Sequence, residues 1–349
     1  MTENSKRNSS IELLRIFLGC SVVVLHFNYL PGGTGAVGST SGFTKDFLIL
    51  LEILCICAVN TFVLISGYYG SKTNKIDFSK IVKLFVQTIV FQFVITLIEC
   101  ALSRNISIIS LCKSLIPLNY YVVLYSSLMI ISPFINKLLH SIRKETLKTL
   151  VLISFLLFSF YPTIVDILEE VTGMALGSLS SIGISGSEGG YTIVNFIVLY
   201  IIGAYLRISN LRDKLGSKKL IVVYILIIIM LCVWQRILPR TAYHYSNPLV
   251  ILEAVCLFLI FIKINIKSRI INLLSSASFT CFLINISLLK FFGFDWLFDK
   301  TFPTIIIGMI VEVFVIYLLA FFATLLWNLL MKRFFAFTIN KIPTYYMED

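Results

Sequence analysis

Ten apolar stretches, each long enough to cross a bilayer as a helix of about 20 residues, constrain this chain more than any other feature. They lie at about 11–30, 47–69, 79–101, 118–139, 149–168, 191–209, 219–238, 247–264, 272–292 and 304–331. Charged residues make up 13% of the chain and hydrophobic residues 58%, roughly half the usual charge of a soluble domain. This composition excludes an ordinary cytosolic enzyme, a disordered chain and a disulfide-stapled secreted module. It predicts an all-α integral membrane protein, a bundle of about ten transmembrane helices that forms one domain over residues 1–349.

The positions of lysine and arginine predict the orientation. The net charge of +11 is spread over small clusters between apolar stretches, without the contiguous basic patch that nucleic-acid binding needs. If the N-terminus is cytoplasmic, the cytoplasmic segments hold roughly three times as many lysines and arginines as the outer ones. We therefore expect a multi-pass protein of the cell membrane with both termini in the cytoplasm, membrane lipids around it and no nucleic-acid partner.

Neither the cysteines nor the N-terminus indicates a metal site or a cleaved signal. Seven of the eight cysteines lie inside apolar stretches, and no CxxC or Cys/His ligand spacing occurs. We predict buried thiols and no metal. The first apolar stretch is interrupted by Arg15 and has no small-residue cleavage site after it, so we expect an uncleaved first span.

The first span contains an arginine and a histidine, and ionisable groups within spans are candidates for function. Arg15 and His26 are eleven residues apart, close to three full helical turns, so they share one helix face about 16 Å apart along the axis. A guanidinium can hold an anionic donor such as a phosphorylated thioester carrier, and an imidazole can take the proton of an attacking hydroxyl. This pair suits acyl transfer. The alternative is that Arg15 reaches the inner headgroups and His26 forms a hydrogen bond within the bundle.

Several segments resemble the acyltransferase-3 family of membrane acyltransferases, in order and at the corresponding spans. That family has a basic residue and, in the same first span, a histidine at the spacing of Arg15 and His26. The other matching segments are NTFVLISGYYGSK with Ser66, Gly67 and Tyr68, the helix that contains Ser132 and Pro133, VNFIVLYIIGAYLR with Tyr200, Gly203 and Tyr205, and SSASFTCFLIN.

The resemblance implies ten spans, acyl-coenzyme A (usually acetyl-coenzyme A) as the donor and a sugar hydroxyl as the acceptor. It implies that Arg15 and His26 are the catalytic residues and that Arg15 also binds the donor. Asn285 stands where many members have histidine, so the role of that histidine is absent or changed here. Lys72 and Lys75 follow the second span where the family often has two arginines. They are predicted to bind the donor phosphates; alternatively, they only set the topology.

Other residues within or near the spans have less specific interpretations. Tyr120, Tyr121 and Tyr125 begin the fourth span, and we expect them in the aromatic belt at the membrane interface rather than stacked on a sugar. Glu99 and Glu253 are expected to face the interior of the bundle, because exposing a carboxyl to lipid is costly.

The sequence thus predicts a membrane O-acyltransferase that moves an acyl group, expected to be acetyl, to a hydroxyl of a cell-surface polysaccharide or its lipid-linked precursor. A multi-pass transporter or lipid-linked sugar flippase is the main alternative, although such proteins commonly show internal repeats and we find none. A polysaccharide polymerase is a second alternative and would be expected to have a large outer loop with several arginines. The loop at 169–190 contains none.

Overall fold

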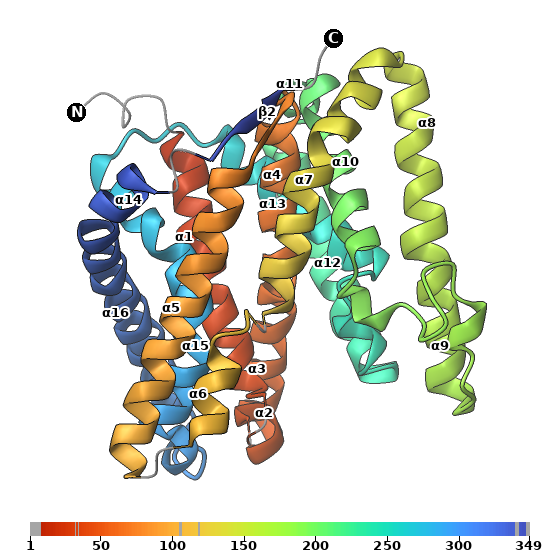
Figure 1. The fold of residues 1–349 in the computed structure, drawn as a ribbon. Coiled ribbons are helices and arrows are strands. Elements are labelled where there is room, and N and C mark those ends of the chain that lie inside the picture. The colour runs from red at the N-terminus through yellow and green to blue at the C-terminus, as the bar shows by residue number, and fades with distance from the viewer. Residues whose placement is uncertain are drawn as a thin grey trace.

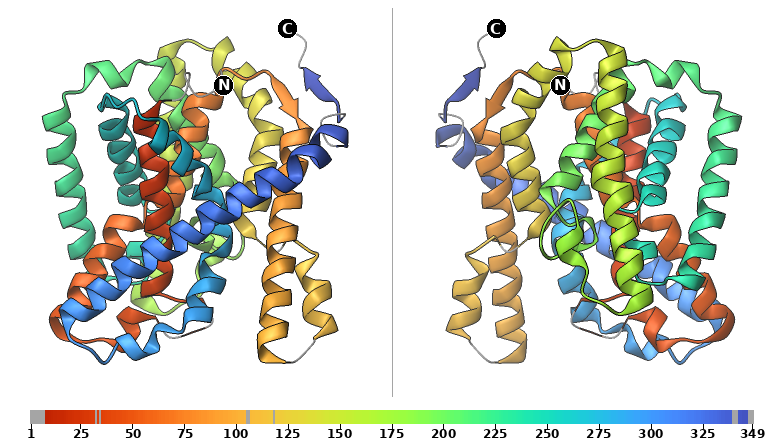
Figure 2. Two further views of the ribbon diagram at one scale, coloured as in Figure 1. Left: turned by 90° about the vertical axis from the view of Figure 1, so that its left-hand side faces the viewer. Right: turned by 90° about the vertical axis from the view of Figure 1, so that its right-hand side faces the viewer.

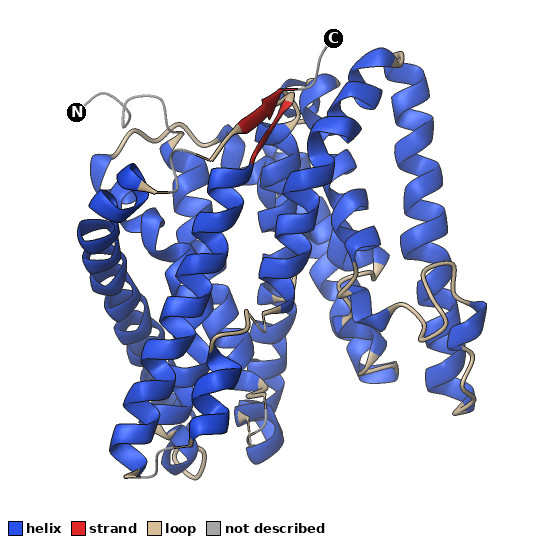
Figure 3. Cartoon of the chain, in the orientation of Figure 1, coloured by secondary structure: helices blue, strands red, loops and turns tan. Residues whose placement is uncertain are grey.

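The computed structural model describes residues 8–31, 33, 35–104, 107–117, 119–338 and 342–346. These residues form a bundle of helices with one small two-stranded sheet at one end (Figure 1 and Figure 3). Nine helical segments among the described residues are long and apolar enough to cross a membrane. The prediction of an all-α, multi-pass membrane protein is confirmed.

The nine long segments match nine of the predicted spans. They are α1 (Ser9–Asn28), α3–α4 (Gly42–Cys55, Ala58–Gly70), α5 (Phe78–Ser103), α7 (Tyr120–Ser141), α8–η1–α9 (Lys144–Phe155, Leu156–Phe160, Tyr161–Thr172), α12 (Ser217–Ile237), η4–α13 (Thr241–Tyr243, Pro248–Lys263), α14–η5–α15 (Arg269–Leu274, Ser275–Ala277, Ser278–Phe292) and α16 (Phe302–Phe337). The shorter elements are α2 (Ala36–Ser39), α6 (Ile108–Ser114), η2 (Gly177–Leu179), η3 (Glu188–Gly190), α11 (Leu211–Lys214), η6 (Phe294–Leu297), β1 (Lys75–Asp77) and β2 (Thr344–Tyr346).

The predicted span at 191–209 corresponds to α10 (Ile193–Ile208), which has 16 residues and is shorter than the other nine. A helix of that length extends about 24 Å, less than the hydrocarbon thickness of about 30 Å. Most of α10 is buried, and it packs on α4, α7 and α8. Because protein rather than lipid surrounds it, this helix does not need the length of a lipid-facing span.

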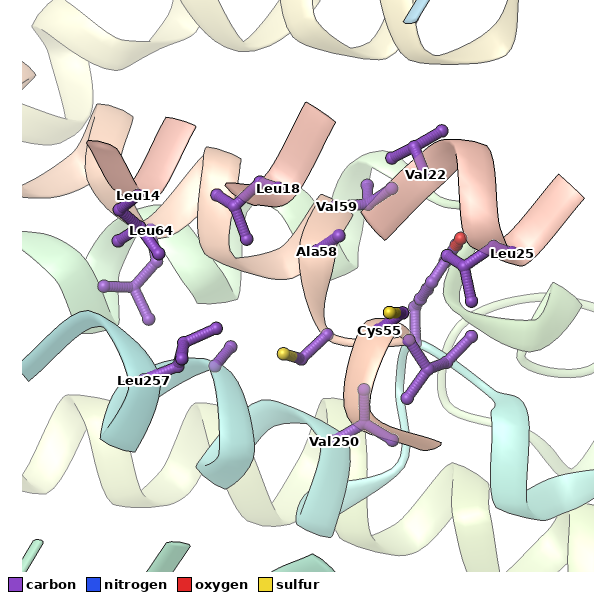
Figure 4. Close-up of a cluster of buried hydrophobic side chains, with 14 of the residues drawn as sticks. Leu14, Leu18, Val22, Leu25, Cys55, Ala58, Val59, Leu64, Val250 and Leu257 are labelled. Carbon is purple, nitrogen blue, oxygen red and sulfur yellow. The ribbon is translucent and has the colours of Figure 1, made fainter. Parts of the chain in front are cut away.

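The central packing contact, between α4 and α10, depends on two glycines. A methyl group on Gly67 of α4 would overlap the carbonyl oxygen of Tyr200, and one on Gly203 of α10 would overlap that of Leu64. The two backbones therefore approach at a distance that only glycine permits, as in small-residue contacts between membrane helices. Figure 4 shows the adjoining apolar core, where α1, α4 and α13 bring Leu18, Val59 and Leu257 together with their neighbours.

Two helical segments depart from straight spans. The second predicted span is broken at Ile56–Cys57, so that α3 and α4 are separate helices. The last helix, α16, is long and runs obliquely across one side of the bundle (Figure 2).

A strand pairing and two hydrogen bonds connect several lysine- and arginine-rich segments at one end of the bundle. Strand β1, which follows α4, pairs antiparallel with β2 near the end of the chain. Ser9 Oγ, in the first turn of α1, donates a hydrogen bond to the carbonyl oxygen of Ser268. The His140 ring, in the last turn of α7, bonds the carbonyl oxygen of Ser71. These segments thus lie at the same end, and its assignment to the cytoplasm stays a prediction.

The two glutamates expected to face the interior differ. Glu253 on α13 is completely buried, as predicted. Glu99 on α5 is exposed, so that prediction is wrong. Helix α5 lies at the edge of the bundle, with 11% of its apolar window buried, and Glu99 lies in its last two turns. From there its carboxylate can reach the headgroup region.

Candidate active site

Arg15 lies in an inner cavity at the end of the bundle that carries the lysine- and arginine-rich segments. This inner cavity, of about 620 Å³, is lined by residues of α1, α4, α5, η5, α15 and α16, among them Arg15, Tyr69, Gln87, Ser275, Phe279 and Trp327. Arg15 Nη1 forms an ion pair of 2.8 Å with Glu12 Oε1, and Glu12 Oε2 accepts a 2.5 Å hydrogen bond from Ser275 Oγ. The guanidinium is thus held from one side while 37% of the side chain stays accessible.

A narrower, middle cavity of about 250 Å³ adjoins the inner one. It shares Arg15, Ser275, Ser276 and Phe279 with the inner cavity, and it continues between α4, α7 and α15. Its further lining is mainly apolar and aromatic: Val59, Phe62, Ile65, Leu84, Tyr121, Tyr125 and Phe282, with Ser66 and Ser278.

His26 lies in an outer cavity of about 750 Å³ at the opposite end. This outer cavity shares Val59 and Phe282 with the middle one. Five tyrosines line it: Tyr29, Tyr120, Tyr191, Tyr243 and Tyr245. Asn119, Glu52 and Arg240 are among its polar lining residues. Arg15 and His26 therefore line the two ends of one series of three cavities along α1, although no one of these three contains both.

The hydrogen bond between His26 and Asn285 fixes the tautomer of the imidazole. Asn285 Nδ2 donates to the carbonyl oxygens of Cys281 at 3.0 Å and Phe282 at 2.7 Å, so both amide hydrogens are used within α15. Its Oδ1 faces His26 Nδ1 and can only accept. His26 Nδ1 must then carry the hydrogen, which leaves the lone pair on Nε2.

A family model described as an acyltransferase domain, Acyl_transf_3, matches residues 8–333, nearly the whole chain. The chain belongs to this acyltransferase family. No curated protein and no solved structure shows significant similarity to it. The membership makes the protein a membrane acyltransferase and favours that interpretation over a transporter, a flippase or a polymerase.

A buried polar pair in this acyltransferase was not singled out in the sequence. Glu52 of α3 lines the outer cavity and is 4% exposed, and its Oε2 accepts a 2.9 Å hydrogen bond from Nδ2 of the fully buried Asn28. Glu52 and His26 thus line the same outer cavity. A glutamate in the middle of an apolar stretch was the available signal, and the same reasoning that selected Glu99 and Glu253 would have found it.

The aromatic-belt interpretation of the fourth span is wrong for two of its tyrosines. Tyr121 is 8% exposed, and its ring is stacked on that of Tyr125 at 5.5 Å between centroids. Both line the middle cavity, and Tyr125 OH bonds Ser66 Oγ at 3.0 Å. Tyr120 lines the outer cavity. The belt pattern gives depth in the membrane, whereas here the face of α7 that carries these rings turns towards α4 and α15.

Lys72 and Lys75 are not brought to Arg15. Lys72 is exposed, and Lys75 lies in β1 with its ammonium 5.6 Å from the centre of the Tyr346 ring. In the part of the chain that the structure describes, neither lines the three cavities. Their role in donor binding stays a prediction.

Proposed function

We propose that this membrane acyltransferase moves an acetyl group from acetyl-coenzyme A to a hydroxyl of a cell-surface polysaccharide, or of its lipid-linked precursor, in the cell membrane. The observation that carries the proposal is the series of three cavities along α1, with a fixed cation at one end and a base at the other. This arrangement suits two substrates that arrive from opposite sides of the bilayer.

The inner cavity suits the nucleotide portion of the donor. Arg15 supplies a permanent positive charge for the phosphates, and Gln87 and Ser276 supply further hydrogen-bonding groups. The rings of Trp327 and Phe279 offer apolar faces for the adenine. The middle cavity, narrower and largely apolar, suits the pantetheine arm that carries the thioester. Lys72 and Lys75, at the same end of the bundle, would attract the anionic donor towards the inner cavity.

The outer cavity suits the acceptor. Tyrosine rings give sugars flat apolar faces together with hydroxyl groups that can form hydrogen bonds. Glu52, which lines the same cavity as His26, offers an additional hydrogen-bond acceptor to a sugar hydroxyl. The cavity volume of about 750 Å³ is within the usual range for small-molecule sites.

The chemistry follows from the His26 tautomer. The acceptor hydroxyl attacks the thioester carbonyl carbon, and His26 Nε2 takes the hydroxyl proton as the new C–O bond forms. The C–S bond then breaks, the sulfur of coenzyme A leaves as a thiolate, and the imidazolium returns the proton to it. The products are the acetylated sugar and free coenzyme A. The hydrogen bond from Nδ1 to Asn285 stays in place throughout.

The test is transfer of label by the purified protein in lipid vesicles, with a glycan extract from cells that lack this activity as the acceptor. With acetyl-coenzyme A labelled in the acetyl group, the glycan should become labelled, whereas label in the adenine should stay in the soluble fraction. Arg15→Ala should raise the KM for acetyl-coenzyme A or abolish turnover, and Arg15→Lys should retain part of the activity because the charge remains. Absence of labelled glycan with active, folded protein would contradict the proposal.

A further inference from the structure

The segment 239–247, which lies between α12 and α13, supplies four residues of the outer cavity: Pro239, Arg240, Tyr243 and Tyr245. Apart from the short turn η4, this segment lies outside the helices and strands. Its position therefore depends on contacts with other parts of the chain, and several of these contacts come from α9.

Two carboxyl groups on one face of α9 hold the segment. Asp166 and Glu170 are four residues apart, which places them on the same side of the helix. The Glu170 carboxylate accepts two hydrogen bonds of 2.9 Å, from the backbone N–H groups of Arg240 and Thr241. Asp166 is 6% exposed, and its Oδ2 lies 2.9 Å from His244 Nδ1, which donates because a carboxylate can only accept.

Asp166 also binds the end of the 169–190 loop. Its Oδ2 atom accepts a second hydrogen bond, from Ser187 Oγ, and Ser187 is 1% exposed. Two residues further on, the carbonyl oxygen of Gly189 accepts a 2.7 Å hydrogen bond from the N–H group of Tyr245. One buried carboxylate thus joins α9, the end of the loop and the segment before α13.

The joined segments carry two tyrosine rings of the outer cavity. Tyr191 directly follows the loop, and its ring centroid lies 4.9 Å from that of Tyr245 and 4.7 Å from that of Tyr120. All three rings line the outer cavity. The carbonyl oxygen of Tyr245 accepts a 2.8 Å hydrogen bond from Asn60 Nδ2 of α4, so its backbone is bonded on both sides. A shift of either segment would therefore change the aromatic surface that faces an acceptor.

We propose that Asp166, Glu170 and His244 are positioning residues for acceptor binding. They hold Tyr191 and Tyr245 in the arrangement that contacts the sugar. The inference rests on the proposed function, which assigns the outer cavity to the acceptor. In the part of the chain that the structure describes, none of the three lines the inner, middle or outer cavity, so they act through the two tyrosines.

The test measures the apparent KM for the glycan extract at saturating acetyl-coenzyme A, and the KM for acetyl-coenzyme A at saturating extract. Asp166→Ala should raise the apparent KM for the extract at least about fivefold, because two buried donors lose their acceptor. Glu170→Ala should act in the same direction but less, since Glu170 is half-buried and water can partly replace its carboxylate. It also provides a second measurement if Asp166→Ala does not fold. The KM for acetyl-coenzyme A and kcat should stay near the wild-type values.

Glu169→Ala is the matched control, because it removes the same side chain from the neighbouring position of α9. The Glu169 carboxylate accepts a 2.6 Å hydrogen bond from the N–H group of Leu176, within the 169–190 loop. This variant should leave the apparent KM for the extract unchanged. His244→Asn keeps an N–H donor for Asp166, so it should retain a lower apparent KM for the extract than His244→Ala.

The outcomes separate the two proposals. An unchanged apparent KM for the extract in folded Asp166→Ala and Glu170→Ala proteins would overturn the positioning role and leave the proposed function standing. An equal rise in Glu169→Ala would overturn it as well, and so would a fall in kcat with both KM values unchanged. A folded wild-type protein that transfers no acetyl group to the extract would contradict the proposed function itself.

Discussion

The amide of Asn285 determines which nitrogen of His26 can act as a base. Many members of the family have histidine at this position. A histidine could itself be protonated, whereas the amide of asparagine stays neutral at every pH. Because both amide hydrogens are used by carbonyl groups of α15, the amide cannot rotate to present its nitrogen to the imidazole without losing two hydrogen bonds. The substitution thus changes the identity of the partner and keeps a hydrogen-bond acceptor for His26.

His26→Gln should lower the rate of acyl transfer about 10²–10⁴-fold, the usual contribution of a general base. Binding of acetyl-coenzyme A should persist, because Arg15 is about 16 Å away along α1. The measurement is turnover per folded molecule together with donor affinity. Near-normal turnover in a folded His26→Gln protein would contradict the role as base, and lost thermal stability with intact specific activity would indicate a packing role.

Asn285→Leu should lower kcat about 10–100-fold, since loss of one buried hydrogen-bond partner costs about 1–3 kcal/mol. The KM for acetyl-coenzyme A should stay near the wild-type value, because Asn285 orients the base and does not line the inner cavity. Asn285→Asp retains an acceptor oxygen and should keep more activity than Asn285→Leu. Equal loss in both variants, or a rise in donor KM with constant kcat, would contradict a positioning role.

At the scale of helices, the contact between α4 and α10 determines the position of the wall that α4 contributes to the middle cavity. Helix α4 contributes Val59, Phe62, Ile65 and Ser66 to the middle cavity. Its position depends on the two backbones meeting at Gly67 and Gly203. The two glycines belong to the segments that carry the family resemblance, and the structure gives them a packing role.

Gly67→Ala should therefore lower the thermal unfolding temperature, because overpacking a close contact typically costs about 1–3 kcal/mol. Acyl transfer should also fall, since α4 would have to move away from α10. Gly216→Ala is the matched control: a methyl group there has no heavy atom within 4 Å, and its backbone has φ −71°. The measurement is detergent-solubilised thermal stability of both variants. Equal stability of Gly67→Ala and wild type would contradict the packing role.

The sequence predicted the positions of the helices better than the contacts that their side chains make with one another. Apolar length was sufficient to locate the spans, and helical periodicity placed Arg15 and His26 on one face. The hydrogen bond from His26 to Asn285 joins residues 259 positions apart, so no local pattern could reveal it. The same limit explains Tyr121, because hydropathy gives depth in the membrane but not the direction in which a ring points.

At the scale of the whole molecule, the two ends of the cavity series coincide with opposite ends of the bundle. The inner cavity includes Asn8 and the start of α1, and the outer one includes Pro31 and Arg240 in the loops at the other end. In the proposed function, a donor and an acceptor would therefore enter at different ends and would not compete for the same opening. The positions of lysine and arginine predict that the inner cavity opens towards the cytoplasm.

Cysteine labelling with a membrane-impermeant reagent tests that orientation. In a background without the exposed Cys112, single cysteines near residues 75, 145, 215 and 267 should react only after the membrane is opened. Cysteines in the 31–45 and 169–190 loops should react in intact cells. Reaction at residue 75 or 215 in intact cells would contradict the ten-span topology with cytoplasmic termini.

The pairing of β1 with β2 has a consequence for biosynthesis. Strand β1 leaves the ribosome early, after the first two spans, whereas β2 leaves it after α16. During most of translation the segment that joins α4 to α5 therefore has an open strand edge. The strand pairing can form only after α16 has been synthesised, so the helices that precede β2 can enter the bilayer before β1 finds its partner.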